Sequence, residues 1–454
     1  MRKPREYGAE QAYLPLGLFK LRLPFVHYRW EWPEAAQGVI LVAVALSATS
    51  AHMEALGCTF QIAVTMVVLN GLLYILHPTF GDPVFPGWIT PAIPLVLAYL
   101  SGFESGVDRI HATIALQMLM AVLFLVLGVT GLAQRVIHIV PISMRAGILM
   151  GAGIAATYSV IRPDEGARMY GMEVSVIVGA VLCFLIMYSA RYNVWRKKSK
   201  ILEFISKLGM LPGLFGALIL GTLLGELPAP VIEWGITPLH FRELLANYTV
   251  FGMGFPAVDY FIKGLPLMVT CYIIAFGDFV LAETVVKEAD EVRQDEYVEF
   301  NPSRSNVISG IRNLILSLFA PYAPLSGPLW AGGTIAVAER YKHGREAMDS
   351  IYGGVGSYIL AMAVAGLILP IVSLLKPALP IAMSLTMLVQ GFACCYIAMN
   401  MVKTREQQGA AAITAIVVAF QSAAIGLAVG IAMHLILGVL VLEEHEHVEP
   451  AVES

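Results

Sequence analysis

The sequence predicts an all-α protein that crosses a lipid bilayer many times. Of its 454 residues, 57% are hydrophobic and only 14% are charged, whereas a soluble chain carries about 25% charged residues. The mean hydropathy of +0.73 agrees with this class. Two hydrophobic runs, one in each half of the chain, are interrupted by prolines and glycines. Paired interruptions of this kind are typical of a transporter binding site.

Apolar runs and the breaks between them predict fourteen membrane segments. The segments are residues 35–53, 59–77, 88–100, 111–133, 140–161, 172–190, 208–225, 264–283, 304–320, 326–338, 351–374, 378–399, 409–421 and 422–442. Segments three, ten and thirteen are shorter than the about 20 residues of a spanning helix, and the last two could form one bent hairpin. Lys and Arg concentrate in alternate loops, which predicts a multi-pass protein of the cell (inner or plasma) membrane with both termini in the cytoplasm.

The two interrupted runs, residues 86–94 and 321–334, are the candidate site. Irregular backbone at membrane depth survives only where protein or a water-filled cavity satisfies its N–H and C=O groups. The halves also match in spacing, because Pro91 precedes Pro141 by nearly the same distance as Pro328 precedes Pro377. Each proposed repeat has seven segments, which is an odd number. The second copy would therefore enter the membrane from the opposite side and form an inverted repeat.

This order of segments resembles the seven-plus-seven inverted-repeat transporters, which include xanthine/uracil permeases, sulfate permeases and bicarbonate transporters. The resemblance covers residues 35–442. It rests on Asn301–Gly310, which is similar to the entry into the ninth helix of the family, on Leu211–Gly221, which is similar to its seventh helix, and on the proline-led fifth and twelfth segments. It implies short strands and half-helices in segments three and ten, and H+ or Na+ as coupling ion with no other cofactor.

The resemblance also implies two interleaved domains, with a core that carries the substrate and moves against a gate. The expected ranges are 1–34 for a cytoplasmic N-terminal segment, 35–133 and 264–374 for the core, 134–225 and 375–442 for the gate, 226–263 for an extracellular loop and 443–454 for an acidic cytoplasmic tail. A homodimer that forms through the gate domain is implied by the resemblance alone.

The half-helices would begin near Thr90 and Gly332 and point their N-termini at one substrate. A helix N-terminus offers free N–H groups and about +0.5 charge, so it binds an anion without a dedicated basic residue. The expected substrate-binding residues are Ile89, Thr90, Ala92, Ile93, Asp278, Ser326, Trp330, Gly332, Gly333 and Thr334.

Asp278 lies deep in the apolar run that begins at Gly264. A carboxylate at membrane depth costs at least about 2.5–3.5 kcal/mol on insertion scales, so a functional role is the default interpretation. The resemblance to the transporter family implies that Asp278 and Thr334 bind the coupling ion. The alternative is that the segment ends early and Asp278 belongs to the acidic stretch Glu283–Glu299.

Four further polar residues are considered. His52 and Glu54 end the first segment, where the helix either unwinds toward the site or passes into a solvated loop. Arg145 follows Pro141 by one turn and faces either the cavity or the membrane interface. Arg312 is interpreted as an anchor near the cytoplasmic start of the ninth segment.

Composition and motifs argue against several classes of function. The net charge of −4 and the scattered basic residues argue against a nucleic-acid partner. No motif predicts a catalytic or metal-binding cluster, so an enzyme is not expected. The sequence favours a secondary transporter of a small anionic or weakly acidic solute, with a slight preference for a nucleobase-like substrate because no regulatory domain follows the membrane region. The alternatives are a sulfate- or bicarbonate-type anion transporter, which the lack of a glutamate in Trp330–Thr334 favours, and an uncoupled anion channel.

Overall fold

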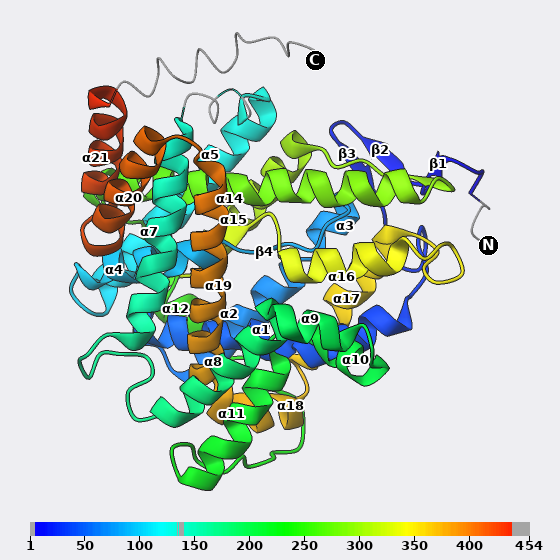
Figure 1. Cartoon of the computed structure of the whole chain (residues 1–454), viewed down its shortest axis with the longest axis horizontal. Helices are drawn as coiled ribbons and strands as arrows, with labels where there is room; N and C mark the ends of the chain where they lie inside the picture. The colour runs from blue at the N-terminus through cyan, green and yellow to red at the C-terminus, as the bar shows by residue number, and fades with distance from the viewer. Residues whose placement is uncertain (1–4, 134, 136–139, 438–454) are drawn as a thin grey trace.

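The computed structural model describes residues 5–133, 135 and 140–437 and consists mostly of helices (Figure 1). The helices are α1 (Trp32–Leu56), α2 (Phe60–Leu73), α3 (Leu76–Phe80), α4 (Ile93–Ser101), α5 (Val107–Thr130), α7 (Ile142–Ile161), α8 (Glu173–Tyr188), α9 (Ala190–Arg196), α10 (Lys200–Lys207), α11 (Leu211–Leu224), α12 (Phe241–Asn247), α13 (Val250–Met253), α14 (Val258–Val292), α15 (Pro302–Phe319), α16 (Ala331–Tyr341), α17 (Ile351–Ala365), α18 (Leu369–Leu375), α19 (Leu379–Met401), α20 (Arg405–Phe420) and α21 (Ala423–Ile436). Two short 3-10 turns are η1 (Thr90–Ala92) and η2 (Lys376–Ala378), and the strands are β1 (Ala9–Glu10), β2 (Leu14–Leu16), β3 (Phe19–Leu21), β4 (Gly87–Trp88), β5 (Glu296–Tyr297) and β6 (Ser326–Gly327).

Each of the fourteen predicted segments contains a helix, because the local signals that begin and end helices are strong. A proline lies in the first turn of α1, α11, α15 and α19, where its missing N–H costs nothing. Thr404 starts α20 through a capping box with Gln407, which satisfies two otherwise unpaired N–H groups.

The structure contains more helices than membrane-spanning helices. Within the described residues, six helices are long and apolar enough to cross a membrane by themselves, and eight spans result if two bent helix pairs are each counted as one. The bent pairs are α8 with α9, at 64°, and α10 with α11, at 87°. The count of fourteen spans therefore stays a prediction.

Several boundaries differ from the predicted ones. Segment 351–374 is broken, because α17 ends at Ala365 and α18 begins at Leu369, next to Pro370. The predicted loop 226–263 contains α12, α13 and the start of α14. Segments thirteen and fourteen are separate helices that pack on each other. The predicted tail 443–454 and the last residues of segment fourteen lie outside the described residues.

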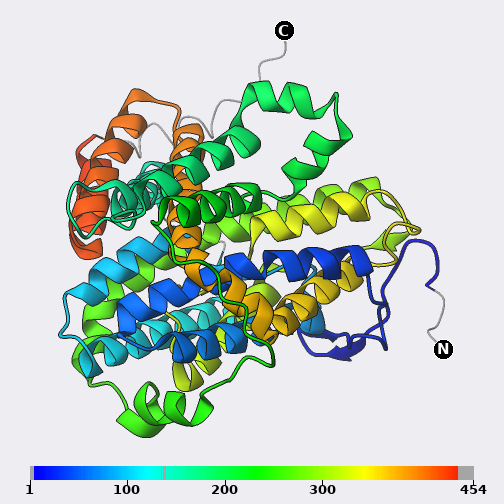
Figure 2. The ribbon, with the colours of Figure 1, turned by 90° about the horizontal axis from the view of Figure 1, so that it is seen from below.

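The helices pack in two sets (Figure 2). In the first set, α15 and α14 pack on α5, and α1 packs on α17. In the second set, α7 packs on α19 and α20, and α8 packs on α11. Helix α19 also contacts α1, so it lies where the two sets meet.

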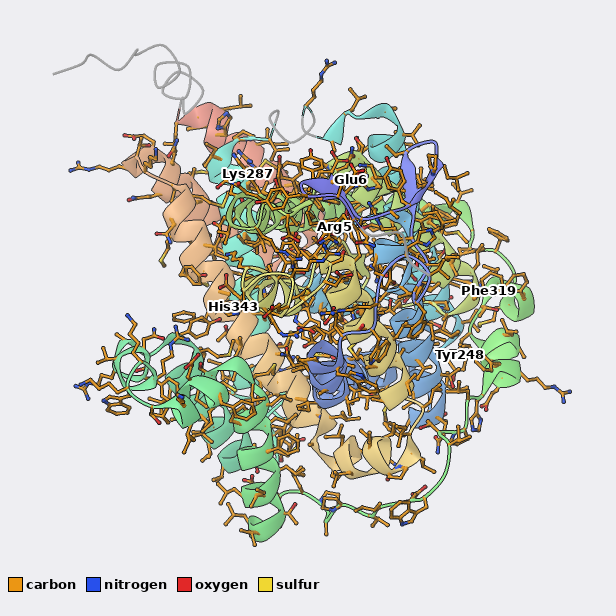
Figure 3. The ribbon with its side chains drawn as sticks, turned by 90° about the vertical axis from the view of Figure 1, so that its right-hand side faces the viewer. Arg5, Glu6, Tyr248, Lys287, Phe319 and His343 are labelled. Atoms are coloured by element: carbon orange, nitrogen blue, oxygen red, sulfur yellow. The ribbon has the colours of Figure 1, made fainter. Side chains whose placement is uncertain are left out.

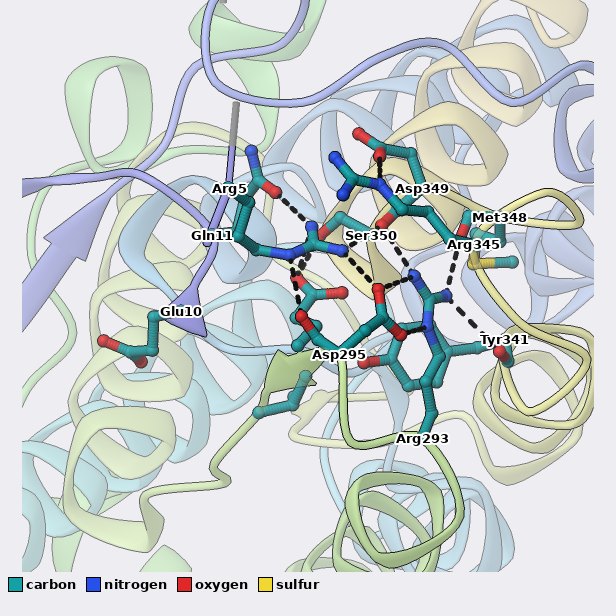
Figure 4. A network of polar contacts seen from close by, with 12 residues as sticks. Arg5, Glu10, Gln11, Arg293, Asp295, Tyr341, Arg345, Met348, Asp349 and Ser350 are labelled. Carbon is teal, nitrogen blue, oxygen red and sulfur yellow. Dashed lines mark hydrogen bonds and ion pairs between the residues drawn. The ribbon is translucent and has the colours of Figure 1, made fainter. Parts of the chain in front are cut away.

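The N-terminal segment closes one end of the first set, which we call the N-terminal face. Strand β1 pairs in parallel with β5, just after α14. The Arg5 guanidinium forms an ion pair with Asp295 at 3.0 Å and donates to the Asp349 carbonyl (Figure 4). Arg293 also pairs with Asp295, at 2.6 Å. Segments that lie far apart in the sequence are thus joined by balanced charges.

The opposite end of the molecule carries the segment between α11 and α14. Phe251 of α13 packs against Phe319 at the end of α15, with 5.1 Å between ring centroids. Figure 3 shows Tyr248 and Phe319 at the same edge of the molecule, away from Arg5. We call this end the opposite face.

Candidate functional site

The two interrupted runs meet as an antiparallel pair of two-residue strands, β4 and β6. Gly87 faces Gly327 and Trp88 faces Ser326. A Cβ added at Gly87 would lie 2.7 Å from the Leu329 carbonyl oxygen, and one at Gly327 would lie 2.9 Å from the Trp88 carbonyl carbon. Only glycine permits this approach of two backbones. We call this place the strand crossing.

A helix leaves the strand crossing on each side. After β4 the chain enters η1 at Thr90 and α4 at Ile93, and after β6 it enters α16 at Ala331. Phe85 ties the two runs together, because its carbonyl accepts from the Trp330 N–H at 2.6 Å. The Thr334 hydroxyl accepts from the Phe85 N–H at 3.0 Å and donates to the Phe85 carbonyl at 3.2 Å. This hydroxyl therefore already serves as a cross-link between the two runs.

The free backbone donors are fewer than the sequence suggests. The Ala92 N–H donates to the Ile89 carbonyl, and the Ile93 N–H donates to the Thr90 carbonyl. At the other half-helix, the Thr334 N–H donates to the Trp330 carbonyl. The first N–H groups of a helix have no intrahelical acceptor, which leaves those of Ala331, Gly332 and Gly333 at the start of α16.

Gly332 and Gly333 face different surroundings. A Cβ at Gly333 would lie 3.2 Å from the Phe85 ring and 3.4 Å from the Trp330 ring, whereas one at Gly332 would meet only Trp330 Nε1, at 3.6 Å. Gly332 is exposed and Gly333 is buried. A solute that approaches α16 therefore reaches the backbone on the Gly332 side.

Arg312 is not an interfacial anchor, and that interpretation is wrong. Helix α15 begins at Pro302, so Arg312 lies ten residues into the helix, and its side chain is fully buried. It donates to the carbonyls of Gly327 at 3.0 Å and Gly87 at 3.4 Å, one in each strand. It also donates to Asn70 Oδ1 at 3.2 Å and Ser326 Oγ at 3.3 Å. The guanidinium therefore holds the strand crossing.

Three buried amides complete the support, and sequence reasoning missed all of them. Asn313 donates to the Ser326 carbonyl at 2.9 Å and accepts from the Ser326 N–H at 3.1 Å. Gln117 of α5 accepts from the Tyr322 N–H at 2.9 Å, and Asn70 of α2 receives the Arg312 bond described above. The sequence did contain a signal for these residues, because each is an amide side chain within an apolar segment. A polar group buried there needs a hydrogen-bond partner.

Asp278 lies within the unbroken helix α14, which continues to Val292. Because this helix is longer than the about 20 residues that span a bilayer, the membrane depth of Asp278 stays a prediction. Helix α14 contacts η1, α4 and α16, the elements that leave the strand crossing. The Asp278 side chain is half-buried and interacts electrostatically with Cys394 of α19. Among the described residues, no hydrogen bond or ion pair involves the carboxylate.

His52 and Glu54 do not lie in an unwound segment, because α1 continues to Leu56. His52 is fully buried, with its ring 4.4 Å from the Tyr322 ring, and neither ring nitrogen has a hydrogen-bond partner within the described chain. Glu54 is exposed and forms an ion pair with Arg168, in the loop after α7. Arg145 is half-buried in the first turn of α7.

Solved structures of other proteins share this fold, and two of them illustrate the likeness. The transmembrane domain of BicA, described as a cyanobacterium bicarbonate transporter, matches with a TM-score of 0.55 and 14% identity, over 88% of this chain and 96% of that chain. The murine Slc26a9 anion transporter, in its inward-facing state, matches with a TM-score of 0.50 and 14% identity, over 90% of this chain and 69% of that chain. No family model and no curated protein matches the sequence. The likeness confirms that the chain has the fold of the resembled transporters.

Proposed function

We propose that this protein is a secondary transporter of a small inorganic anion, with the strand crossing as its binding site. The observation that carries the proposal is the start of α16 beside β6, where the first N–H groups have no intrahelical acceptor and the Gly332 side is open. Such a helix end attracts negative charge. Transport rather than catalysis is supported because the two similar structures described above are titled transporters.

An inorganic anion is favoured over the nucleobase-like substrate that the sequence slightly preferred. The two similar structures are titled as a bicarbonate transporter and an anion transporter. The segment Trp330–Thr334 supplies no carboxylate that could accept from the N–H groups of a planar base. The substrate-binding residues we propose are Thr90, Trp330, Ala331, Gly332 and Gly333.

We further propose that Asp278 binds the coupling ion, H+ or Na+. Its carboxylate has no hydrogen bond or ion pair to other described residues, and its helix contacts both half-helices. A half-buried carboxylate at membrane depth without a partner is costly unless a proton or cation compensates it. Replacement of Asp278 by Asn should therefore leave the melting temperature unchanged or raised, while gradient-driven uptake falls at least about tenfold, the loss expected for about 1.4 kcal/mol.

The two sets of helices are proposed as the moving units, with the α1–α5 and α14–α17 set as core and the α7–α11 and α19–α21 set as gate. The Glu54–Arg168 ion pair joins these sets at the opposite face, and such a contact must break if that face opens. Dimerisation through the gate and the cytoplasmic position of both termini stay predictions.

The test is flux into proteoliposomes that contain the full-length protein. Sulfate, bicarbonate, chloride, uracil and xanthine are offered in turn under an imposed proton gradient, an imposed sodium gradient, or neither. Gradient-driven accumulation of an inorganic anion that Asp278→Asn abolishes is the expected result. Accumulation of uracil or xanthine but no inorganic anion would reject the proposal. Rapid anion flux that neither gradient drives would identify an uncoupled channel instead.

A further inference from the structure

Three buried donors beside the strand crossing have no acceptor. They are Nε1 of Trp88, in β4, the hydroxyl of Tyr322, just before β6, and Nε of Arg312, on α15. None makes a hydrogen bond of good geometry within the part of the chain that the structure describes, and the Tyr322 hydroxyl lies close to the side chains of Asn70 and Trp88. The exposed fraction is 7% for Trp88 and 0% for the other two residues. Buried polar groups in folded proteins are nearly always paired, so three unpaired donors at one place require a cause.

The three groups belong to one cluster. The rings of Trp88 and Tyr322 have centroids 6.4 Å apart. Tyr322 interacts electrostatically with Arg312 and with Tyr74. The Arg312 guanidinium lies over the Tyr74 ring, 4.7 Å from its centroid. His52 packs against Tyr322 from α1, and its two ring nitrogens are also unpaired. We call Trp88, Tyr322 and Arg312 the donor cluster.

The donor cluster carries a positive charge that no carboxylate contacts directly. The hydrogen bonds of Arg312 within the described residues go to carbonyl, amide and hydroxyl oxygens and to Nε2 of His77, at 3.2 Å. The nearby carboxylate of Asp82 binds Nδ1 of His77, at 2.8 Å, on the other side of that ring. Because Nε2 accepts from Arg312, the proton on His77 lies at Nδ1 and points to Asp82.

The chemistry of these groups selects the ligand. The Trp indole and the Arg guanidinium can only donate, and the Tyr hydroxyl can turn its proton toward an acceptor. A cation would be repelled, and a ligand without acceptor atoms would leave the donors unpaired. The location agrees with the proposed function, because Trp88 lies two residues before Thr90, where the first half-helix begins.

We infer that the donor cluster binds the charged group of the transported anion, with Trp88 Nε1 and the Tyr322 hydroxyl as donors and Arg312 as the compensating charge. The inference rests on the proposed function and deepens it. The anion is then held by side chains beside the first half-helix, which begins at Thr90. Its chemical class is a small inorganic oxyanion or halide, since the cluster is closed to bulk solvent.

Conservative variants test the inference in the full-length protein. Tyr322→Phe and Trp88→Phe each remove one donor and retain an aromatic ring. Tyr28→Phe is the matched control, because the Tyr28 hydroxyl is also buried and unpaired but belongs to the N-terminal segment. Flux of sulfate, bicarbonate and chloride into proteoliposomes is measured against concentration. A hydrogen bond to a charged group is worth about 1.5–3 kcal/mol, so each cluster variant should raise the half-saturating concentration at least about tenfold. The control should stay within about twofold of wild type.

A second measurement separates this inference from the proposed function. The melting temperature of the protein in nanodiscs is followed as sulfate, bicarbonate or iodide replaces gluconate at constant ionic strength, because a ligand that binds the folded state stabilises it. Anion-dependent stabilisation that both cluster variants lose would support the donor cluster even if no flux occurs, in which case only the transport proposal fails.

Two results would overturn the inference. The first is normal flux with unchanged half-saturation in Tyr322→Phe and Trp88→Phe. The second is the absence of both flux and anion-dependent stabilisation in the wild type. In either case, buried water molecules that bridge the unpaired donors would explain them instead.

Discussion

Arg312 at the strand crossing and Arg293 at the N-terminal face are both buried, and their environments differ in one partner. Each guanidinium lies over a tyrosine ring, with 4.7 Å to Tyr74 for Arg312 and 4.2 Å to Tyr341 for Arg293. Each also donates to backbone carbonyls from distant segments. Nε of Arg293 donates to Asp295 at 2.6 Å, whereas Nε of Arg312 has no partner among the residues described.

This difference distinguishes a structural contact at the N-terminal face from the proposed binding site at the strand crossing. At the N-terminal face the two charges of Arg5 and Arg293 are balanced by the two carboxylates of Asp295 and Glu296, so the face needs no ligand. At the strand crossing the charge of Arg312 is balanced by no direct carboxylate contact, and the unpaired donors around it point to an anion. Helix α16 connects the two regions, because it begins beside the strand crossing and ends at Tyr341.

The largest expected effect comes from removing each guanidinium in turn. Arg312→Met leaves the carbonyls of Gly87 and Gly327 without this donor, and Arg293→Met leaves Asp295 without its nearest partner. Each unsatisfied buried group costs about 1–3 kcal/mol, so both variants should unfold at clearly lower temperature. Only Arg312→Met should also abolish anion-dependent stabilisation in the nanodisc assay. Equal retention of that stabilisation in both variants would remove the functional distinction between the two regions.

The next effect concerns the first turn of α16. Gly333→Val should lower stability by about 1–3 kcal/mol, because its side chain would collide with the Phe85 and Trp330 rings. A Cβ at Gly332 makes only an ordinary van der Waals contact with Trp330 Nε1, at 3.6 Å. Gly332→Val should therefore keep the melting temperature near that of wild type while it reduces flux at least about tenfold, the factor that about 1.4 kcal/mol gives. Thermal unfolding and flux, measured on both variants, check this pair. Full flux in Gly332→Val would place the solute elsewhere.

A smaller effect concerns pH at the N-terminal face. The hydrogen bond and charge of Arg293 lower the pKa of Asp295 below its ordinary value of 3.8. Because the pKa of Asp295 is lower in the folded than in the unfolded state, its ionisation stabilises the folded protein above about pH 4. This stabilisation is lost as the pH falls through the folded-state pKa. Burial raises the pKa of the neighbouring Glu296, which acts in the opposite sense.

Asp295→Asn isolates this contribution. The variant should be less stable than wild type at pH 7, and the difference should shrink as the pH falls from 4 toward 2. Melting temperatures across that range provide the measurement. If the difference in melting temperature persisted at the lowest pH, Asp295 would stabilise the protein by packing rather than by its charge. The contrast between a balanced charge at Arg293 and an unbalanced one at Arg312 would then not explain the behaviour of the two regions.

The smallest effect concerns the opposite face. The Glu54 side chain is 52% exposed in its pair with Arg168, and exposed ion pairs contribute only about 0.2–1 kcal/mol. Glu54→Gln should leave the melting temperature nearly unchanged and change the rate of anion exchange by no more than about fivefold. Arg168→Gln should match it. A rate that responds to one variant but not the other would show that the pair is not a contact between moving units.

Local features of the sequence determined much of this description. Hydropathy and proline positions predicted a helix within every one of the fourteen segments, because helix starts and apolar runs are local properties. The two interrupted runs were located from prolines and glycines, and the resemblance to the transporter family implied the strands and half-helices that occur there. Asp278 was correctly placed inside an apolar helix, because its position in the run depends only on its neighbours.

The tertiary structure alone decided which of these residues share a site. Arg312 read as an interfacial anchor from the sequence, because its partners Gly87 and Asn70 lie more than 200 residues away in the chain. The same holds for Thr334, whose hydroxyl is bound to Phe85, and for the unlike surroundings of Gly332 and Gly333. Whether a buried charge is balanced depends on contacts between segments that only folding brings together, and no local pattern in the sequence records them.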